Sequence, residues 1–322
     1  MRKIGVMTSG GDAPGMNAAI RAVVRYAGKQ GLEVYGIECG YEGMLKGEIS
    51  KMDSRSVSDI IQKGGTILKT SRCPEFKEFE YRQKAYDILQ AYGIEGLVVI
   101  GGDGSFRGMK DLNNDFGIPC VGIPGTIDND LAYTDYTLGF DTAVNTVLSA
   151  INNIRDTMTA HNRACIIEVM GRKCGDIAVF AGLAGGAEII LVPEIPMDID
   201  TVCRTIRRDK LKGKNSVIII LAEGVCSCLE LKEQILSKVD DLSIRTVKLG
   251  YLQRGGAPSM SDRVLAARCA VKAVDLLCDK DCGCRVVGIK DNKIVDMNIE
   301  DAFAMPGKFN KDLYKIATIL GQ

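Results

Sequence analysis

Short runs rich in valine and isoleucine alternate along this chain with segments of helical length. The runs read KIGVMT, VYGIE, GLVVIGG, PCVGIP, RACIIEV, EIILVP, NSVIIILAE and CRVVGI. The periodic segments between them include residues 17–29, 140–159 and 262–278. Strands that are apolar along their whole length are typical of parallel sheets that helices cover on both faces. The alternation therefore predicts an α/β fold with a mostly parallel, doubly wound sheet.

The bulk composition is that of a globular protein without an overall charge. Hydrophobic residues make up 46% and charged residues 25% of the 322 residues, a length sufficient for two α/β domains. Lys plus Arg and Asp plus Glu both number 41, so no global field attracts nucleic acid or acidic membranes. Positive charge is instead clustered locally, at Arg204, Arg207, Arg208, Lys210, Lys212 and Lys214. No Pro/Ser-rich linker marks a domain boundary.

The apolar stretches are too short to span a membrane. The stretch at 217–222 is far below the ~20 residues that a membrane helix needs. Met1 to Lys3 leads directly into a strand-like run, without the apolar segment of a signal peptide. We therefore expect a cytoplasmic location and no membrane partner.

Twelve cysteines raise the question of a disulfide or metal framework. The densest groups are Cys278, Cys282 and Cys284, and the pair Cys226 and Cys228. Neither group has a CxxC…CxxC spacing, and the only histidine is His161. Most of the other cysteines lie in apolar runs, where a thiol serves as a small core residue. This pattern favours reduced structural or incidental thiols over a metal site.

Several apolar runs end in a glycine-rich turn that leads into a helical segment. These turns are SGGDAPGMN at 9–17, GGDGSFRGM at 101–109 and MGRKCGD at 170–176, and GTIDND at 125–130 follows another run. Open α/β sheets bind ligands at the carboxyl ends of their strands, where glycines admit a close backbone approach. None of the turns is a Walker A sequence or a GxGxxG fingerprint. Taken alone, GTIDND is more typical of a solvated loop.

Together the motifs resemble the 6-phosphofructokinase family, in its short bacterial ATP-dependent form. The resemblance is carried by TSGGDAPGMNAAIR, VVIGGDGS, PGTIDND, VMGRKCGD, AGG and LGYLQRGG, and it extends from Lys3 to about Gly307. It implies transfer of the γ-phosphoryl group of MgATP to the 1-hydroxyl of fructose 6-phosphate, in a glycolytic homotetramer. It also implies two doubly wound, mostly parallel-sheet domains with the active site in the cleft between them. Residues 1–138 and 252–304 would form the larger, ATP-binding domain, and residues 139–251 and 305–322 the smaller, fructose 6-phosphate-binding domain.

The resemblance gives chemical roles to the residues of GTIDND. Asp128 would take the proton of the sugar hydroxyl, Asp130 would help to organise Mg²⁺, and Thr126 would contact the transferring phosphoryl group. In an extended backbone, residues i and i+2 face the same side, roughly 6.5 Å apart. Asp128 and Asp130 would then serve two neighbouring points of one site. Arg172, in VMGRKCGD, corresponds to the arginine that stabilises the transition state.

Nucleotide and metal contacts are also implied by matching positions. The nucleotide-side positions are Gly11, Tyr41, Arg72, Cys73, Gly102, Asp103, Gly104 and Ser105. Of these, Asp103 matches the Mg²⁺-linked aspartate.

A further set of positions matches the contacts to fructose 6-phosphate. In addition to the catalytic residues, they are Arg163, Met170, Gly171, Glu223, Arg245, Tyr251 and Arg254. In the family, Arg163 and Arg245 would reach in from a neighbouring subunit. Tyr251 stands where the family pattern has histidine, and the alternative is that it packs against the strand without meeting substrate.

An effector pocket for a nucleoside diphosphate and phosphoenolpyruvate is implied as well. The matching positions are Arg21, Arg25, Arg55, Arg155, Glu188, Lys212 and Lys214. Ser54 and Asn215 stand where basic residues are expected, and Lys77 replaces an arginine near the nucleotide.

Two other functions remain as alternatives. A pyrophosphate-dependent phosphofructokinase tends to carry aspartate at the position of Gly104 and lysine at that of Gly125, and this chain has neither. A non-catalytic nucleotide sensor of the same fold would be favoured by loss of Asp103, Asp128 or Arg172, and all three are present.

Overall fold

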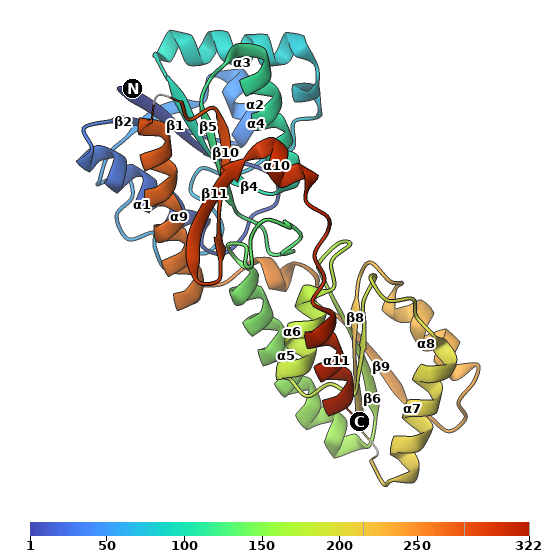
Figure 1. Cartoon of the computed structure of the whole chain (residues 1–322). Coiled ribbons are helices and arrows are strands. Elements are labelled where there is room, and N and C mark those ends of the chain that lie inside the picture. Colours follow the sequence, from blue (N-terminus) through green and yellow to red (C-terminus); the bar gives the residue numbers. More distant parts are fainter. Residues whose placement is uncertain (215, 280, 322) are drawn as a thin grey trace. The chain divides into compact units, whose positions relative to one another are not determined.

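Two separate sheets organise the chain (Figure 1). The computed structural model describes residues 1–214, 216–279 and 281–321. Unit 1 comprises Met1–Ile127, Leu131–Thr142 and Arg254–Gly307. Unit 2 comprises Asp128–Asp130, Ala143–Gln253 and the chain from Lys308 onward. The chain therefore passes between the units several times, and one passage lies inside the GTIDND segment.

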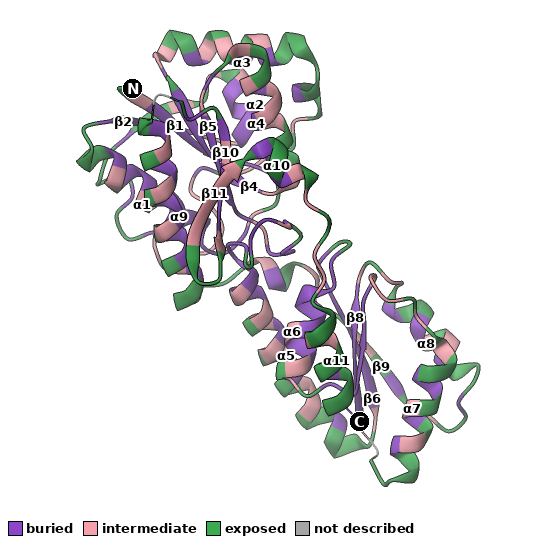
Figure 2. Ribbon diagram, viewed as in Figure 1, coloured by how far each residue is buried: buried purple, intermediate pink, exposed green. Residues whose placement is uncertain are grey.

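The sheet of unit 1 has seven strands in the order β11-β10-β5-β4-β1-β2-β3. The strands are β1 (Lys3–Thr8), β2 (Glu33–Ile37), β3 (Ile49–Met52), β4 (Gly96–Gly101), β5 (Cys120–Pro124), β10 (Cys284–Lys290) and β11 (Lys293–Asn298). The five central strands are parallel, and the edge strands β3 and β11 pair antiparallel to their neighbours. Every residue of β4 and β5 is buried, as Figure 2 shows. Burying one Leu or Ile side chain contributes about 1.5–3 kcal/mol, so these strands anchor the unit.

Helices cover both faces of this sheet. They are α1 (Met16–Lys29), α2 (Gly40–Lys46), α3 (Phe79–Tyr92), α4 (Asp103–Phe116), α9 (Met260–Cys278) and α10 (Ile299–Ala304), with a 3-10 turn η1 (Pro74–Lys77). Helices α1 and α9 pack against each other on one face. Helices α2, α3, α4 and α10 enclose an apolar core on the other face, with Phe106 and Leu89 fully buried in it.

The sheet of unit 2 has four parallel strands in the order β7-β8-β6-β9. The strands are β6 (Ala164–Val169), β7 (Ile189–Leu191), β8 (Val217–Ala222) and β9 (Ile244–Lys248). The helices are α5 (Phe140–His161), α6 (Asp176–Ala184), α7 (Ile199–Leu211), α8 (Cys228–Leu236) and α11 (Lys311–Leu320), with a 3-10 turn η2 (Gly250–Arg254). Helices α6 and α11 lie on one face, and α7 and α8 cover the other through a core that includes Ile206, Leu231 and Ile235.

The architecture confirms the predicted α/β class with mostly parallel sheets. Each apolar run contains a strand, and the three periodic segments form α1, α5 and α9. Strands β3, β9 and β11 were not expected, because their sequences ISKM, IRTVK and KIVDMN mix charged and apolar residues. No helix among the described residues is long and apolar enough to cross a membrane.

Candidate active site

Two of the predicted loops and the first residues of a third lie together in unit 1, at the carboxyl ends of β1, β4 and β5. The Ser9 amide donates to the Ile100 carbonyl oxygen at 3.0 Å, and the Gly125 amide donates to the Gly101 carbonyl oxygen at 2.8 Å. A β-carbon at Gly101 would lie 2.7 Å from the Ser9 carbonyl oxygen. The loops after β1 and β4 therefore approach each other this closely only because residue 101 is glycine. Adjacent parallel strands thus bring the glycine turns to one edge of the sheet.

The first turn of α4 presents a carboxylate beside open space. Asp103 Oδ2 accepts from Arg107 Nε at 2.9 Å, and its Oδ1 accepts from Arg107 Nη2 at 3.1 Å. A β-carbon at Gly104 would meet no heavy atom within 4 Å. Mg²⁺ is usually bound by one or two carboxylates together with water and substrate phosphates. The partly exposed Asp103 carboxylate fits that requirement, even though no group of three or more His, Cys, Asp or Glu side chains in the described chain could hold a metal alone.

Tyr41 is buried beneath the start of α4. Its hydroxyl donates to the Ser105 carbonyl oxygen at 2.6 Å, and its ring stacks on Phe76 with centroids 4.0 Å apart. Burial raises the pKa of Tyr41 well above its ordinary value. Arg72 is exposed, and burial raises the pKa of the half-buried Cys73 thiol. The structure therefore gives Tyr41 a supporting position under the loop that carries Asp103.

Arg254 lies on the first glycine turn. Its Nη1 donates to the Asp12 carbonyl oxygen at 3.1 Å, and a β-carbon at Gly11 would collide with its guanidinium group. Arg254, predicted to bind the sugar phosphate, thus lies against Gly11, predicted to border the nucleotide.

Thr126, also in unit 1, is half-buried, and its carbonyl oxygen accepts from Thr137 Oγ1 at 2.6 Å.

The expected extended backbone at residues 128–130 is wrong. Asn129 has a φ of 54°, in the left-handed region, so the chain bends there. Asp128 is consequently buried while Asp130 is exposed, and the two carboxylates do not share one face of a strand. Among residues with a β-carbon, asparagine and aspartate adopt this conformation most readily.

In unit 2, Asp128 lies beside Arg172. The Arg172 Nε atom is 3.8 Å from Asp128 Oδ2, and the two side chains are 65% and 4% exposed. Arg172 also has a left-handed backbone, with a φ of 55°, and its amide donates to Glu223 Oε1 at 2.9 Å. Left-handed residues other than glycine are concentrated at functional sites, where the surroundings hold them.

Residues of the predicted sugar site gather where β6 and β8 end. Met170, Gly171 and Arg172 follow β6, and Glu223 follows β8. The fully buried Gln253 joins them, because its Oε1 accepts from the Met170 amide at 3.1 Å. The sequence reasoning missed Gln253, although it lies inside the LGYLQRGG motif.

Two predicted arginines lie elsewhere in unit 2. Arg163 precedes β6, and Arg245 is the second residue of β9, opposite Cys165 near the start of β6. Met170 lies seven positions after Arg163, roughly 23 Å along an extended strand. The sheet therefore does not bring Arg163 and Arg245 to the Asp128–Arg172 pair of the same chain. Tyr251 is 83% exposed, so the alternative that it packs against the strand is wrong for the isolated chain.

Three of the predicted effector residues form a cluster around a buried carboxylate. Glu188 Oε1 lies 2.6 Å from Lys214 Nζ and 3.4 Å from Arg155 Nη1, and its Oε2 accepts from the Ile218 amide at 2.6 Å. The remaining positions lie on α1, in the loop after β3 and at the end of α7, and all but the half-buried Arg21 are exposed, namely Arg21, Arg25, Ser54, Arg55 and Lys212. Asn215 lies outside the described residues.

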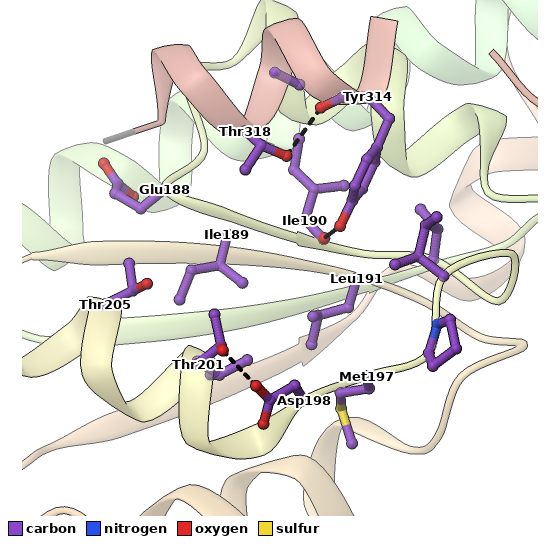
Figure 3. Close-up of a pocket in the computed structure, with 15 residues that line it drawn as sticks. Glu188, Ile189, Ile190, Leu191, Met197, Asp198, Thr201, Thr205, Tyr314 and Thr318 are labelled. Atoms are coloured by element: carbon purple, nitrogen blue, oxygen red, sulfur yellow. Dashed lines mark hydrogen bonds between the residues drawn. The ribbon is translucent and has the colours of Figure 1, made fainter. Parts of the chain in front are cut away.

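A pocket of about 230 Å³ opens between β7, α7 and α11 (Figure 3). Its wall is mostly aliphatic, and Tyr314 on α11 donates through its hydroxyl to the Ile190 carbonyl oxygen at 3.2 Å. Among the described residues, Glu188 is the one predicted site residue in its lining, and no Lys or Arg of the described chain lines it. It is therefore not the predicted anion-binding site.

The dense cysteine group is mostly buried. Cys282 and Cys284 lie inside unit 1, and burial raises the pKa of their thiols to about 11 and about 12. Cys278 is exposed. Buried thiols with raised pKa values are poor nucleophiles and ligands, which suits a structural role.

Comparison with known proteins identifies similar chains. A family model described as phosphofructokinase matches residues 3–277. A curated relative, the ATP-dependent 6-phosphofructokinase of Clostridium tetani, is 59% identical over 320 residues, which cover 99% of each chain.

Solved structures have the same fold. A phosphofructokinase from Saccharomyces cerevisiae is similar with a TM-score of 0.89 and 34% identity, over 94% of this chain and 45% of the yeast chain. A pyrophosphate-dependent phosphofructokinase from Marinobacter aquaeolei has a TM-score of 0.84 at 21% identity, over 99% of this chain and 91% of the other. At that identity the second likeness shows the fold alone.

Proposed function

This chain belongs to the phosphofructokinase family, and from that premise we propose how its residues carry out the reaction. It is a phosphotransferase that moves the γ-phosphoryl group of ATP to the 1-hydroxyl of fructose 6-phosphate, giving fructose 1,6-bisphosphate and ADP. We propose that unit 1 binds ATP and unit 2 binds the sugar phosphate, and that the reaction takes place in the cytoplasm.

The observation that carries the proposed mechanism is the Asp128–Arg172 pair. In this proposal Asp128 accepts the proton of the 1-hydroxyl as that oxygen attacks phosphorus. Its burial protects the carboxylate from water, and its turn fixes the direction in which it points. The exposed Arg172 guanidinium is free to donate to the equatorial oxygens of the phosphoryl group, where charge must be neutralised. The Thr126 hydroxyl would contact the same group.

Asp103 would hold Mg²⁺ with the phosphates of ATP, and Asp130 would help to organise its hydration. When bound, the metal would neutralise negative charge on the phosphates. Gly11, Gly102, Gly104 and Ser105 would border the phosphates through their backbone. The α4 N-terminus adds its partial positive charge at that point. Arg72, Tyr41 and Cys73 would complete the nucleotide side.

The sugar phosphate would be held mainly by arginines. Glu223 and Met170 would contact the sugar, and Arg254 and Tyr251 would contact its phosphate. We propose that Arg163 and Arg245 serve the site of a neighbouring subunit in a homotetramer. Their place at the amino ends of β6 and β9, away from the Asp128–Arg172 pair of their own chain, supports this assignment.

We further propose that the Glu188 cluster belongs to an effector site. Lys214, Arg155 and Lys212 would bind phosphate groups of a nucleoside diphosphate or of phosphoenolpyruvate, and Arg21, Arg25 and Arg55 of unit 1 would be effector contacts as well. The short Lys214–Glu188 contact holds one ammonium group in place without removing its remaining donors.

The space at two glycines favours ATP over pyrophosphate as donor. Gly104 leaves room for a nucleotide phosphate. At Gly125, a β-carbon would lie 2.9 Å from Ile100 Cγ2 and 3.1 Å from Met16 Cε, so the lysine typical of the pyrophosphate enzymes would not fit without a shift. A coupled assay with fructose 6-phosphate, run in parallel with ATP and with pyrophosphate, tests the proposal. Turnover with pyrophosphate but not with ATP would refute the assignment of ATP as the phosphoryl donor. Absence of turnover with both donors would favour a non-catalytic nucleotide sensor.

A further inference from the structure

The turn that carries Asp128 is tied to the loop before α6 by successive contacts within unit 2. Asp128 Oδ2 faces Arg172 Nε at 3.8 Å. The next residue, Asn129, receives the Cys174 thiol on its carbonyl oxygen at 4.0 Å. The Asn129 amide group then donates through Nδ2 to Asp176 Oδ2 at 2.7 Å. Asp128 thus contacts Arg172, and Asn129 contacts both Cys174 and Asp176.

The last of these contacts is shielded from water. Asn129 is 1% exposed and Asp176 is 5% exposed. A hydrogen bond to a carboxylate is stronger than one between neutral groups, and its loss leaves a buried polar atom unpaired. The left-handed backbone of Asn129 is disfavoured for residues with a β-carbon, and it persists where the surroundings fix it. The Asn129–Asp176 hydrogen bond is placed to provide that constraint.

Asp176 is itself a fixed point. It lies in the first turn of α6, directly after Gly175, whose amide donates to Glu194 Oε1 at 2.8 Å. A β-carbon at Gly175 would lie 2.5 Å from Val192, so this stretch of the loop is closely packed. The Cys174 amide closes the loop with a bond to the Gly171 carbonyl oxygen at 2.8 Å. If Asn129 were displaced, the closely packed Asp176 could therefore not readily move with it.

We propose that Asn129 and Asp176 are positioning residues for the transfer step, because their hydrogen bond holds the bend that aims Asp128 at the sugar hydroxyl. The inference rests on the proposed role of Asp128 as the base. Neither residue needs to touch substrate. A misplacement of about 1 Å in a reacting group can cost ~10²-fold in rate, so a small relaxation of this bend is expected to reduce turnover.

An exchange of the two side chains tests this proposal. Asn129→Asp tolerates the left-handed backbone but sets one carboxylate against another. We expect it to lower kcat by ~10-fold or more, with the KM for ATP changed by less than about two-fold. The double variant Asn129→Asp/Asp176→Asn restores a donor and an acceptor in reversed order, and it should recover kcat to within about three-fold of the unmodified protein. Asp209→Asn, at a buried carboxylate of α7 in the same unit, is the matched control and should leave kcat unchanged.

Asn129→Gly provides a second variant in case Asn129→Asp does not fold, because glycine accepts the left-handed backbone and lacks the amide group. An unchanged kcat in the folded fraction of both single variants would overturn the proposal, whatever their melting temperatures. Failure of the exchange variant to recover kcat once its melting temperature is restored would also overturn it. Absence of turnover in the unmodified protein is a separate result, which overturns the proposed function and this inference with it.

Discussion

The Arg172 Nε atom lies 3.8 Å from Asp128 Oδ2, beyond the usual 2.7–3.2 Å of a hydrogen bond. The carboxylate is held in a buried turn, whereas the guanidinium group extends into solvent from a residue with a left-handed backbone. One partner is thus preorganised and the other can move. This difference suits a base of fixed direction beside a cation that follows a phosphoryl group.

Replacement of Asp128 by serine should abolish most of the turnover. If Asp128 is the general base, kcat should fall by at least ~10²-fold, the usual contribution of proton transfer. Affinity for ATP, measured by direct binding without sugar phosphate, should change little because the predicted nucleotide contacts belong to unit 1. Near-normal turnover in the folded variant would remove Asp128 from the mechanism.

A carboxylate at position 104 should impair the use of ATP without disturbing the fold. Gly104→Asp places a negative charge in open space, so the melting temperature should be unaffected. Two like charges about 4 Å apart repel by ~4 kcal/mol at an effective dielectric constant of about 20, so the KM for ATP should rise by roughly ten-fold or more. Gly104→Ala adds volume without charge and is the control. Equal effects of the two substitutions would show that charge does not select the donor.

The strands that could be predicted from the sequence are those whose own side chains are apolar throughout. The runs that form β4 and β8 are apolar throughout, and both strands are fully buried. Strand β9 was not predicted because IRTVK mixes charged and apolar residues, and its pairing with β6 cannot be read from the local sequence.

In the candidate site, too, the motifs could be predicted from local sequence, whereas contacts between residues distant in the sequence could not. Its motifs and their order could be recognised, but the bent residue Asn129 is hydrogen-bonded to Asp176, 47 positions away. An assumption of regular extended backbone therefore failed there. Likewise, nothing local to Arg254 indicates that its guanidinium group lies on Gly11.

Complementation between inactive variants should show whether the sites are shared between subunits. Arg163→Ala and Asp128→Ala should each be inactive alone. If Arg163 serves a neighbour, random mixing in a closed homo-oligomer should leave on the order of one quarter of the sites intact. Activity is measured after subunit exchange, which tagged subunits can verify. No recovery despite verified exchange would mean that each site is self-contained.

Loss of the Lys248–Glu168 ion pair should destabilise unit 2 in a pH-dependent way. Lys248 Nζ lies 2.6 Å from Glu168 Oε1, and the Cys228 amide donates to Glu168 Oε2 at 2.9 Å. Burial, the largest influence, raises the pKa of Glu168, but the hydrogen bonds from Lys248 and Cys228 together outweigh it and leave the pKa below its ordinary value. This contribution to stability is therefore present above the unfolded pKa of about 4.3 and is lost as pH falls through the folded pKa.

Lys248→Met should accordingly lower the melting temperature most near neutral pH, because it leaves the Glu168 carboxylate buried without its cation. The gap to the unmodified protein should narrow as the pH falls below the ordinary glutamate pKa of about 4.3 and Glu168 becomes protonated. Thermal unfolding of both proteins from pH 3 to pH 8 measures this difference in melting temperature. A gap of constant size across that range would show that lost packing, and not charge, causes the effect.

Tyr251→Phe should weaken binding of fructose 6-phosphate and leave the fold intact. The side chain is 83% exposed, so removal of its hydroxyl should not change the melting temperature. A tyrosine hydroxyl can donate to a phosphate but stays neutral, unlike the histidine of the family pattern. A hydrogen bond to a charged group contributes ~1.5–3 kcal/mol, so the KM for fructose 6-phosphate should rise by roughly ten-fold or more. The KM for ATP serves as the internal control. An unchanged KM for the sugar phosphate would leave Arg163, Arg245 and Arg254 to hold the phosphate without Tyr251.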